Sequence, residues 1–323
     1  MGRRARRGIC GISIEEALPW LKEHRKEFLQ SIRDGSYMPS PVRRKEIPKP
    51  DGGVRKLGIP TVVDRVIQQA IAQKLQSIWE PLFADSSYGY RPRRSAQQAI
   101  QKVKEYAEEG YRYAVSVDLS KYFDTLNHEQ LMNLLHKQIQ DMRVLRLIKK
   151  YLKSGVMENG VICKTEEGSP QGGPLSPLLA NIYLNECDWE MNRRGVKLVR
   201  YADDIVVLAK SERAAERLLE SCRKYLEGRL KLKMNTEKSK VTSIFAQKEF
   251  QVPWILFGQE WKRYLYPCAQ KISCQGEGKA ETSYKAQPWT QCSQDNAGSE
   301  GVHPRLDWLL SSSQYETNAD VLG

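Results

Sequence analysis

No apolar run in the 323-residue sequence approaches the roughly 18 to 20 residues that a membrane-spanning helix requires. The basic N-terminal stretch Arg3 to Arg7 is not followed by the apolar core of a signal peptide. The seven cysteines lack paired short spacings, so neither a zinc site nor a disulfide framework is indicated. Internal repeats are absent as well. We therefore expect a cytoplasmic protein that has no membrane partner.

Positive charge is concentrated in the first 250 residues. Charged residues make up 28% and hydrophobic residues 40% of the chain, which is typical of a soluble globular protein with two or three packed sub-domains. The formal net charge is +12, and residues 251–323 hold 6 basic and 8 acidic residues, so residues 1–250 carry +14. A surplus of this size favours a polyanionic partner, most simply nucleic acid. The charge alone is also compatible with a basic protein that is merely soluble.

The stretch from Val199 to Ala209 places two adjacent carboxylates, Asp203 and Asp204, between two apolar runs rich in β-branched residues. This pattern predicts a strand, a tight turn and a second strand, with the acids at the turn. Anions at the tip of buried strands need a positive counterpart, because unpaired charges beside a core are costly. A divalent metal ion is the simplest counterpart. For an isolated Asp-Asp pair, a solvated turn is the alternative.

A second expected strand, Tyr113 to Leu119, carries Asp118 near its end. If the two strands are neighbours in one sheet, Asp118 and Asp203 face each other across two metal ions. Mg²⁺ suits such a site because it prefers carboxylate oxygens, and a two-metal site is the usual solution for nucleotidyl transfer. Successive strand residues point to opposite faces. We therefore expect Asp118 and Asp203 to be the principal ligands and Asp204 to have a secondary role.

Hydrophobic periodicity and turn signals predict alternating helices and hairpins along the first 250 residues. The expected helices cover residues 14–34, 62–78, 95–109, 128–139, 142–153, 177–194 and 211–227, with Ser95 as a cap and Pro177 in a first turn. The expected hairpins pair Val42–Ile47 with Val54–Ile59 around Asp51-Gly52-Gly53, and bend residues 156–165 around Glu158-Asn159-Gly160. A last strand is expected over residues 240–245.

Two short motifs resemble those of reverse transcriptases. Tyr201-Ala202-Asp203-Asp204 resembles their signature, and Ser169-Pro170-Gln171-Gly172 resembles the loop of their dNTP site. The similarity to group II intron-encoded reverse transcriptases, the bacterial intron maturases, is closer and covers about residues 10–250. It rests on further motifs in order, namely Pro41–Arg44, Ile47–Gly53, Leu57–Thr61, Asp64–Ala70, Ser87–Pro92, Gln171–Leu179 and Asn235–Ser239. This resemblance implies an α+β fold with the fingers and palm of a right-hand polymerase, the palm being an antiparallel sheet with packed helices.

The resemblance also implies roles for residues around the acidic turn. Asp118, Asp203 and Asp204 would form the metal triad that binds two Mg²⁺ ions. Phe123 resembles the aromatic gate that excludes a ribose 2′-hydroxyl, since an apolar ring leaves an added hydroxyl without a hydrogen-bond partner. Gln171 resembles the residue that lies along the incoming nucleotide. An ordinary core aromatic and a loop glutamine that satisfies backbone groups are the respective alternatives.

Basic residues at positions that match motifs of this family are expected to contact phosphates. Lys49 and Arg55 resemble clamps on the dNTP triphosphate. Lys238 would donate a proton to pyrophosphate. A group consisting of Arg43, Arg44 and Lys45 would hold group II intron RNA or the RNA template through phosphate contacts. The alternative for the basic residues of the hairpin is a solvated surface.

The expected domains are fingers with an N-terminal RNA-binding extension over residues 1–112, and a palm over 113–250 to which 155–185 contributes the junction with the fingers. Beyond Phe250 the pattern departs from the family, because no Phe-Leu-Gly primer grip or basic thumb is readable. Shifting the reading frame by one base allows two family motifs in the right order, so we attribute the departure to a frameshift. Residues 251–323 are then a non-homologous, disordered tail, with the thumb absent or non-native. Near the N-terminus, Cys10 replaces an expected Asp.

We expect an RNA-directed DNA polymerase and maturase of a group II intron that extends a DNA primer on an RNA template and assists intron splicing and mobility. Its activity is expected to be impaired in this chain, because the segment that should place the primer is altered. A non-catalytic remnant that binds intron RNA is the alternative. A different class, such as retron or diversity-generating reverse transcriptases, is a third interpretation, against which the maturase-like fingers motifs argue.

Overall fold

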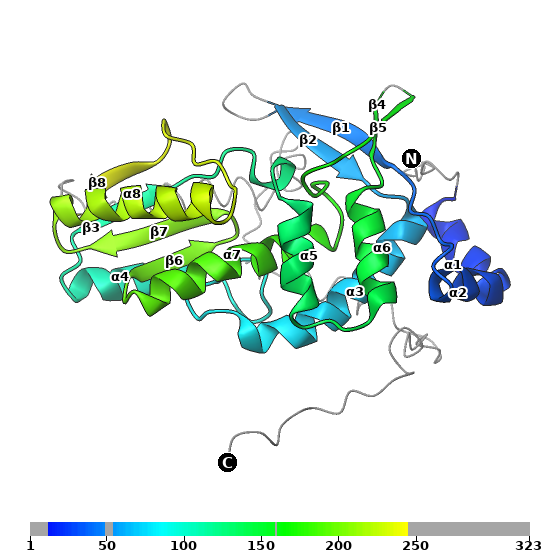
Figure 1. Ribbon diagram of the computed structural model, residues 1–323, viewed down its shortest axis with the longest axis horizontal. Helices are drawn as coiled ribbons and strands as arrows, with labels where there is room; N and C mark the ends of the chain where they lie inside the picture. The colour runs from blue at the N-terminus through cyan, green and yellow to red at the C-terminus, as the bar shows by residue number, and fades with distance from the viewer. Residues whose placement is uncertain (1–11, 49–53, 159, 245–323) are drawn as a thin grey trace, which may run out of the picture. The chain divides into compact units, whose positions relative to one another are not determined.

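The computed structural model describes residues 12–48, 54–158 and 160–244 (Figure 1). The chain divides into two compact units, residues 1–258 and 259–323, and the second lies wholly outside the described residues. The predictions for Cys10, for Lys49, for the turn at Asp51-Gly52-Gly53 and for the tail 251–323 also fall outside them. They therefore stay predictions.

One four-stranded antiparallel sheet, here called the β3 sheet, has the strand order β6-β7-β3-β8. Its strands are β3 (Tyr113–Val117), β6 (Lys197–Tyr201), β7 (Asp204–Ala209) and β8 (Lys240–Ser243). Apolar β-branched residues dominate the two central strands, and residues 205–209 of β7 are all buried. The condition that the two acid-bearing strands are neighbours in one sheet is met, because β3 pairs directly with β7.

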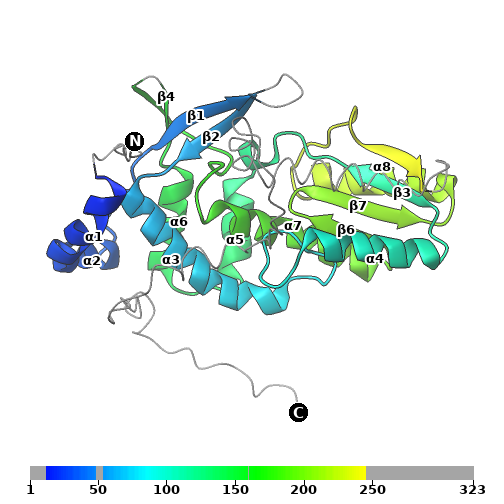
Figure 2. The same ribbon diagram turned by 180° about the vertical axis from the view of Figure 1, so that it is seen from behind.

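Helices cover both faces of the β3 sheet. The helix α4 (Ala96–Glu108) packs Ala99, Val103 and Ala107 against Val199 and Val206, so it covers the face formed by these strand residues. The helix α8 (Glu212–Gly228) packs on β3, β7 and β8. Figure 1 shows α8 in front of this sheet, and Figure 2 shows α4 on the side opposite to α8. Both strand faces are therefore buried, as the continuous apolar run of β7 requires.

A second four-stranded sheet, here called the β1 sheet, has the order β2-β1-β4-β5. Its strands are β1 (Val42–Pro48), β2 (Val54–Ile59), β4 (Val156–Glu158) and β5 (Val161–Cys163). The predicted β1–β2 hairpin is confirmed, and its register runs from Arg43 opposite Ile59 to Pro48 opposite Val54, one residue later in β1 than the expected arm Val42–Ile47. A parallel pairing of Val42 with Val156 joins the second hairpin to the first. No local sequence pattern predicts this pairing.

The remaining helices largely match the expected ranges. They are α1 (Ile14–Glu23), α2 (Arg25–Arg33), α3 (Val62–Trp79), α5 (His128–His136), α6 (Met142–Leu152) and α7 (Ser176–Arg193), with single 3₁₀ turns η1 (Glu80–Leu82) and η2 (Tyr122–Asp124). The prediction of one helix over residues 14–34 is wrong, because the helix is interrupted at His24 and forms the two helices α1 and α2. The His24 ring nitrogen Nδ1 lies 3.1 Å from the Trp20 carbonyl oxygen, so the side chain caps α1. No helix among the described residues is long and apolar enough to cross a membrane.

Candidate active site

The acidic turn lies between β6 and β7. Tyr201 pairs with Asp204 across the two strands, so only Ala202 and Asp203 form the turn. Ala202 has a φ of 58°, a left-handed conformation that is uncommon for a residue with a Cβ. Asp204 is the first residue of β7 and shares a strand face with Val206, which packs toward α4. The two neighbouring carboxylates therefore start from different environments, one in the turn and one on the sheet.

Asp118 follows β3 directly, on the strand that pairs with β7. Its position is fixed through its backbone. The Asp118 N–H donates to Ser239 Oγ at 3.0 Å, and the Asp118 carbonyl accepts from the Asn235 N–H at 2.8 Å. Both partners belong to the predicted motif Asn235–Ser239, so this motif supports Asp118 from the neighbouring segment of the sheet.

Electrostatics connect Asp203 with Asp118. Burial raises the pKa of the Asp203 carboxyl above its ordinary value, and the negative charge of Asp118 raises it further. The positive charges of Arg55 and Arg200 act in the opposite direction. An anionic neighbour that disfavours the ionisation of a buried carboxyl makes a site that a divalent cation would stabilise.

The residues present fit Mg²⁺ as a pair of carboxylates. Asp118 and Asp203 supply the oxygen ligands that Mg²⁺ prefers, and this ion keeps most of its other positions for water and phosphate. Within the described ranges, no three His, Cys, Asp or Glu side chains converge closely enough to hold a metal ion. The predicted triad is thus not preassembled, and the structure brings together two of its members.

The predicted dNTP loop is tied to Phe123 and to the β1–β2 hairpin. The Ser169 N–H donates to the Phe123 carbonyl at 2.6 Å, and the Gly58 N–H of β2 donates to the Gln171 carbonyl at 2.7 Å. Gly172 has a φ of 123°, and a Cβ there would lie 2.9 Å from the Gly58 carbonyl oxygen. The loop that contains Gln171 is therefore hydrogen-bonded through its backbone both to Phe123 and to β2.

Phe123 lies in η2 beside a buried aromatic residue. Tyr122 is 3% exposed and donates its hydroxyl to the Ala180 carbonyl at 2.7 Å, so it is the aromatic that anchors this turn to α7. The Phe123 ring lies 5.4 Å from the Tyr122 ring, centroid to centroid, and is only half-buried. Part of Phe123 is therefore available for contact with another molecule.

The predicted basic residues are distributed over two regions. Arg55 on β2 is exposed, and its charge acts on Asp203. A group of three residues, Arg43, Arg44 and Lys45, lies on β1 of the same hairpin. Lys238 is exposed in the turn before β8, where its N–H donates to Asn235 Oδ1 at 3.3 Å. Of these residues, Arg55 is the one whose charge is shown to act on the carboxylate pair.

Tyr90 is a site residue to which the sequence analysis assigns no role. It has a φ of 56° and keeps 51% of its surface exposed. Burial of its hydroxyl and the charge of Asp203 raise the pKa of Tyr90 to about 12. The preceding Gly89 lies so close to the turn that a Cβ there would collide with the Ala202 backbone nitrogen. The available sequence signal is the motif Ser87–Pro92, which places an aromatic residue directly after this glycine.

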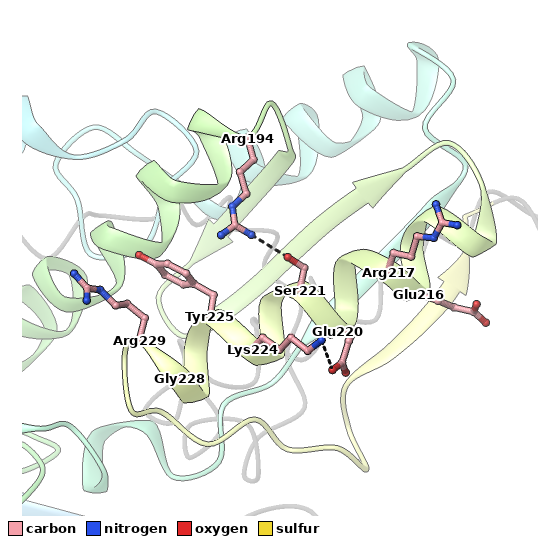
Figure 3. Close-up of a pocket in the computed structure, with 9 residues that line it drawn as sticks. All are labelled: Arg194, Glu216, Arg217, Glu220, Ser221, Lys224, Tyr225, Gly228 and Arg229. Carbon is pink, nitrogen blue, oxygen red and sulfur yellow. Dashed lines mark hydrogen bonds and ion pairs between the residues drawn. The ribbon is translucent and has the colours of Figure 1, made fainter.

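A second concave surface lies along α8 and has different chemistry. Its volume is about 830 Å³, and Figure 3 shows the residues that line it, Arg194, Glu216, Arg217, Glu220, Ser221, Lys224, Tyr225, Gly228 and Arg229. Polar side chains bond to one another here, because Arg194 donates to Ser221 Oγ at 2.9 Å and Lys224 Nζ lies 3.6 Å from Glu220 Oε1. None of the predicted site residues lines it. We regard it as a solvated helix surface.

A family model described as "Reverse transcriptase (RNA-dependent DNA polymerase)" matches residues 47–282. The chain therefore belongs to the reverse transcriptase family, and its enzyme class is RNA-directed DNA polymerase. Within that family, the predicted similarity to group II intron-encoded proteins is confirmed. It is 39% identical over 245 residues to the group II intron-encoded protein LtrA of Lactococcus lactis, an alignment that covers 75% of this chain and 40% of LtrA.

A further relative and a solved structure are also similar to this chain. The protein YkfC of Escherichia coli is 39% identical over 258 residues, which cover 67% of this chain and 68% of YkfC. The apo telomerase structure from Candida tropicalis shares the fold with a TM-score of 0.51 at 12% identity, covering 65% of this chain and 45% of that one. The predicted α+β fold with fingers and palm is thereby confirmed.

Proposed function

We propose that this chain copies an RNA template into DNA by nucleotidyl transfer at the pair Asp118 and Asp203, in the service of a group II intron. The observation that carries the proposal is the placement of these two carboxylates at the ends of the paired strands β3 and β7. The nearby Asp204 begins the same strand β7. A group II intron RNA is the proposed partner because LtrA, a relative with 39% identity over 245 residues, is named as a group II intron-encoded protein.

Asp118 and Asp203 are the principal ligands for two Mg²⁺ ions in this proposal, and Asp204 is a secondary ligand. When bound, the ions supply activation of the primer 3′-oxygen and stabilisation of the leaving pyrophosphate. The protein contributes the fixed positions of the carboxylates. Asn235 and Ser239 hold the Asp118 backbone, and the two-residue turn presents Asp203.

The nucleotide is proposed to lie against the loop that contains Gln171, with Phe123 beside its sugar. The hydrogen bonds from Ser169 to Phe123 and from Gly58 to Gln171 keep these groups in a fixed relation. Arg55, together with Lys49 of the same hairpin, would neutralise the triphosphate. Lys238 would donate a proton to the pyrophosphate, since it projects from the turn that holds Asp118 in place.

The RNA is proposed to contact β1 through Arg43, Arg44 and Lys45. Arg44 supports this assignment, because its Nε atom is buried without a hydrogen-bond partner among the described residues. The formal net charge of +14 over residues 1–250 also favours binding to RNA. Retained RNA binding without synthesis is the second candidate function. It is favoured by the departure from the primer-grip pattern after Phe250, which leads us to expect weak extension.

Single-nucleotide extension of a DNA primer on an RNA template, measured with and without Mg²⁺, tests the proposal. Asp203→Asn should lower incorporation by about a hundredfold or more, because a missing metal ligand removes transition-state stabilisation. RNA binding should stay unchanged. Asp85→Asn is the matched control, since the Asp85 side chain is 96% exposed and away from the carboxylate pair. Incorporation that survives Asp203→Asn would contradict the proposed site, and RNA binding without any incorporation by the wild type would favour the second candidate.

A further inference from the structure

Arg200 is a fully buried cation directly beneath the acidic turn. Its side chain is 0% exposed, and it lies in β6 between the buried Val199 and the half-buried Tyr201. A guanidinium removed from water is costly unless every donor finds an acceptor. The arrangement of its partners therefore shows what this part of the structure is built to hold.

All five N–H groups of Arg200 have acceptors. The Nε–H and one Nη2–H donate to the Asp188 carboxylate of α7, with distances of 2.9 Å to Oδ1 and 2.6 Å to Oδ2. The second Nη2–H donates to Ser87 Oγ at 2.8 Å, and one Nη1–H donates to Asn181 Oδ1 at 2.8 Å. The remaining Nη1–H donates to the Ala202 carbonyl oxygen at 2.8 Å. This fork of donors matches the geometry that only arginine provides.

The bond to Ala202 acts on the turn itself. The Ala202 carbonyl belongs to the peptide plane that continues into the Asp203 nitrogen, so a donor at this oxygen fixes the orientation of that plane. Ala202 also has the left-handed φ of 58°, which is disfavoured for alanine and persists only where neighbours hold it. Arg200 is thus bonded to the backbone group on which the direction of Asp203 depends.

The same network locks a second segment against the turn. The Arg200 N–H donates to the Ser86 carbonyl at 2.8 Å, and the Arg200 carbonyl accepts from the Tyr88 N–H at 2.8 Å. Asn181 Nδ2 donates to the Gly89 carbonyl at 2.7 Å, while its Oδ1 accepts from Arg200. Gly89 approaches Ala202 too closely to allow a Cβ. The turn is therefore held from α7, from β6 and from residues 86–89.

We propose that Arg200 is a positioning residue that sets the direction of Asp203 toward Asp118 by fixing the Ala202–Asp203 peptide, with Asp188 and Asn181 holding the guanidinium in place. This inference rests on the proposed function of the carboxylate pair. A buried ion pair with a purely structural role would stabilise the fold without affecting how the pair binds a cation. The two roles are therefore separable by a measurement of Mg²⁺ affinity.

The test compares the wild type with Arg200→Lys, which retains the charge but cannot bond to Asp188, Ser87, Asn181 and Ala202 together. Mg²⁺ is titrated in two assays, thermal unfolding and single-nucleotide extension. We expect the Mg²⁺ concentration for half of the thermal shift to rise by about tenfold or more, as is typical when support for a metal ligand is lost. The Mg²⁺ dependence of extension should move by the same factor.

Arg91→Lys is the matched control. Arg91 is also buried, at 8% exposure, and its guanidinium is bonded to Glu80 and to the carbonyls of Ala84 and Ser87, with no bond to the turn. The Arg91→Lys variant should lose thermal stability to a similar degree as Arg200→Lys. Its Mg²⁺ midpoint, the concentration for half of the thermal shift, should stay at the wild-type value. If Arg200→Lys fails to fold, the double variant Arg200→Met with Asp188→Leu removes the ion pair as a unit, which proteins often tolerate. This variant should show the same shift in the Mg²⁺ midpoint.

The outcomes separate the inference from the function on which it rests. A wild type that shows neither a Mg²⁺-dependent thermal shift nor Mg²⁺-dependent extension overturns the proposed site, and the inference with it. A wild type that responds to Mg²⁺ while Arg200→Lys and the double variant keep its midpoint overturns the inference alone. An equal shift in Arg91→Lys would also overturn it, because loss of stability would then explain the effect.

Discussion

The backbone N–H of Gly58 donates to the carbonyl oxygen of Gln171 at a distance of 2.7 Å. This bond joins β2, the fingers strand that carries Arg55, to the loop proposed to hold the nucleotide. Gly58 is packed so closely that a Cβ would lie 2.6 Å from Val42 Cγ2 and 3.0 Å from Pro170 Cβ. The position of the hairpin that is proposed to bind the triphosphate thus depends on a glycine, although the backbone conformation of Gly58 does not require one.

Gly58→Ala should therefore separate β2 from the Gln171 loop. We expect a loss of about 2 kcal/mol in the free energy of unfolding, as is typical of overpacking in a core. The KM for dNTP should rise severalfold, because the hairpin and the loop no longer approach the nucleotide together. Urea unfolding and single-nucleotide kinetics measure the two effects.

Gly228→Ala is the control for this substitution. Gly228 ends α8, and a Cβ there would meet no atom within 4 Å, so stability should stay the same or rise slightly. Equal KM values for the wild type and Gly58→Ala would show that the contact between β2 and the loop does not affect nucleotide binding.

Stability should fall in mild acid because of His128. Its Nε2–H donates to the Gly168 carbonyl at 2.6 Å, and its Nδ1 is buried without a partner among the described residues. Burial lowers the pKa of His128 below its ordinary value of 6.5, and the charges of Lys153 and Lys149 lower it further. Below about pH 6.5 the unfolded chain therefore takes up a proton that the folded chain refuses, so stability decreases as the pH falls toward the folded-state pKa.

Urea unfolding between about pH 5.5 and 7.5 measures this effect. His128→Gln retains a donor for the Gly168 carbonyl but cannot be protonated, so its stability should decline less steeply in acid than that of the wild type. His136→Gln, at an exposed position of α5, should follow the wild type. Identical slopes for the wild type and His128→Gln would show that another group causes the acid sensitivity.

Sequence patterns predict the local elements around the site. They place Asp118 at the end of one expected strand and Asp203 at a turn between two others, and the structure pairs the first with one of these as β3 and β7. Ser95 caps α4 through its hydroxyl, as its position before an amphipathic run indicates. The β1–β2 hairpin follows from a turn signal between two arms, but its register does not, because Ile59 pairs with Arg43 and not with Val42, the first residue of the expected arm.

Contacts between distant segments are not predictable in this way. The parallel pairing of Val42 with Val156 joins residues more than a hundred positions apart, and neither strand carries a local signal for it. Arg200 interrupts an apolar strand, and its carboxylate partner lies on a helix that precedes it in the chain. Hydrophobic periodicity describes which face an element buries, but it does not describe which polar groups satisfy one another inside the core.

Asp64 should be important for the stability of the fingers. Its side chain accepts from Thr61 Oγ1 at 2.6 Å, from the Tyr37 hydroxyl at 2.8 Å and from the Tyr151 hydroxyl at 3.2 Å. Asp64 is 1% exposed, and burial raises the pKa of Tyr151, which keeps that hydroxyl protonated as a donor. Asp64→Ala removes the common acceptor of these donors and should cost about 3 kcal/mol of unfolding free energy.

Asp85→Ala is the control for Asp64→Ala. Asp85 has a 96% exposed side chain that pairs with Arg94, and surface pairs of this kind contribute little. Loss of the Asp85 side chain should change the free energy of unfolding by less than about 0.5 kcal/mol, as measured by urea denaturation. A similarly small loss for Asp64→Ala would show that water replaces the carboxylate without cost.

Phe123 should determine the preference for deoxyribonucleotides. It is half-buried next to the anchored Tyr122, and the Ser169 N–H is bonded to its carbonyl, so its ring is held beside the proposed nucleotide loop. Phe123→Ala opens space and admits water where a ribose 2′-hydroxyl would lie. The ratio of kcat/KM for rNTP to that for dNTP should therefore rise by about 10 to 100-fold, which is the range that such apolar contacts provide. Phe28→Ala, which alters a half-buried aromatic residue of α2, should leave this ratio unchanged. An unchanged ratio in Phe123→Ala would instead assign Phe123 to the core and require another residue to exclude the hydroxyl.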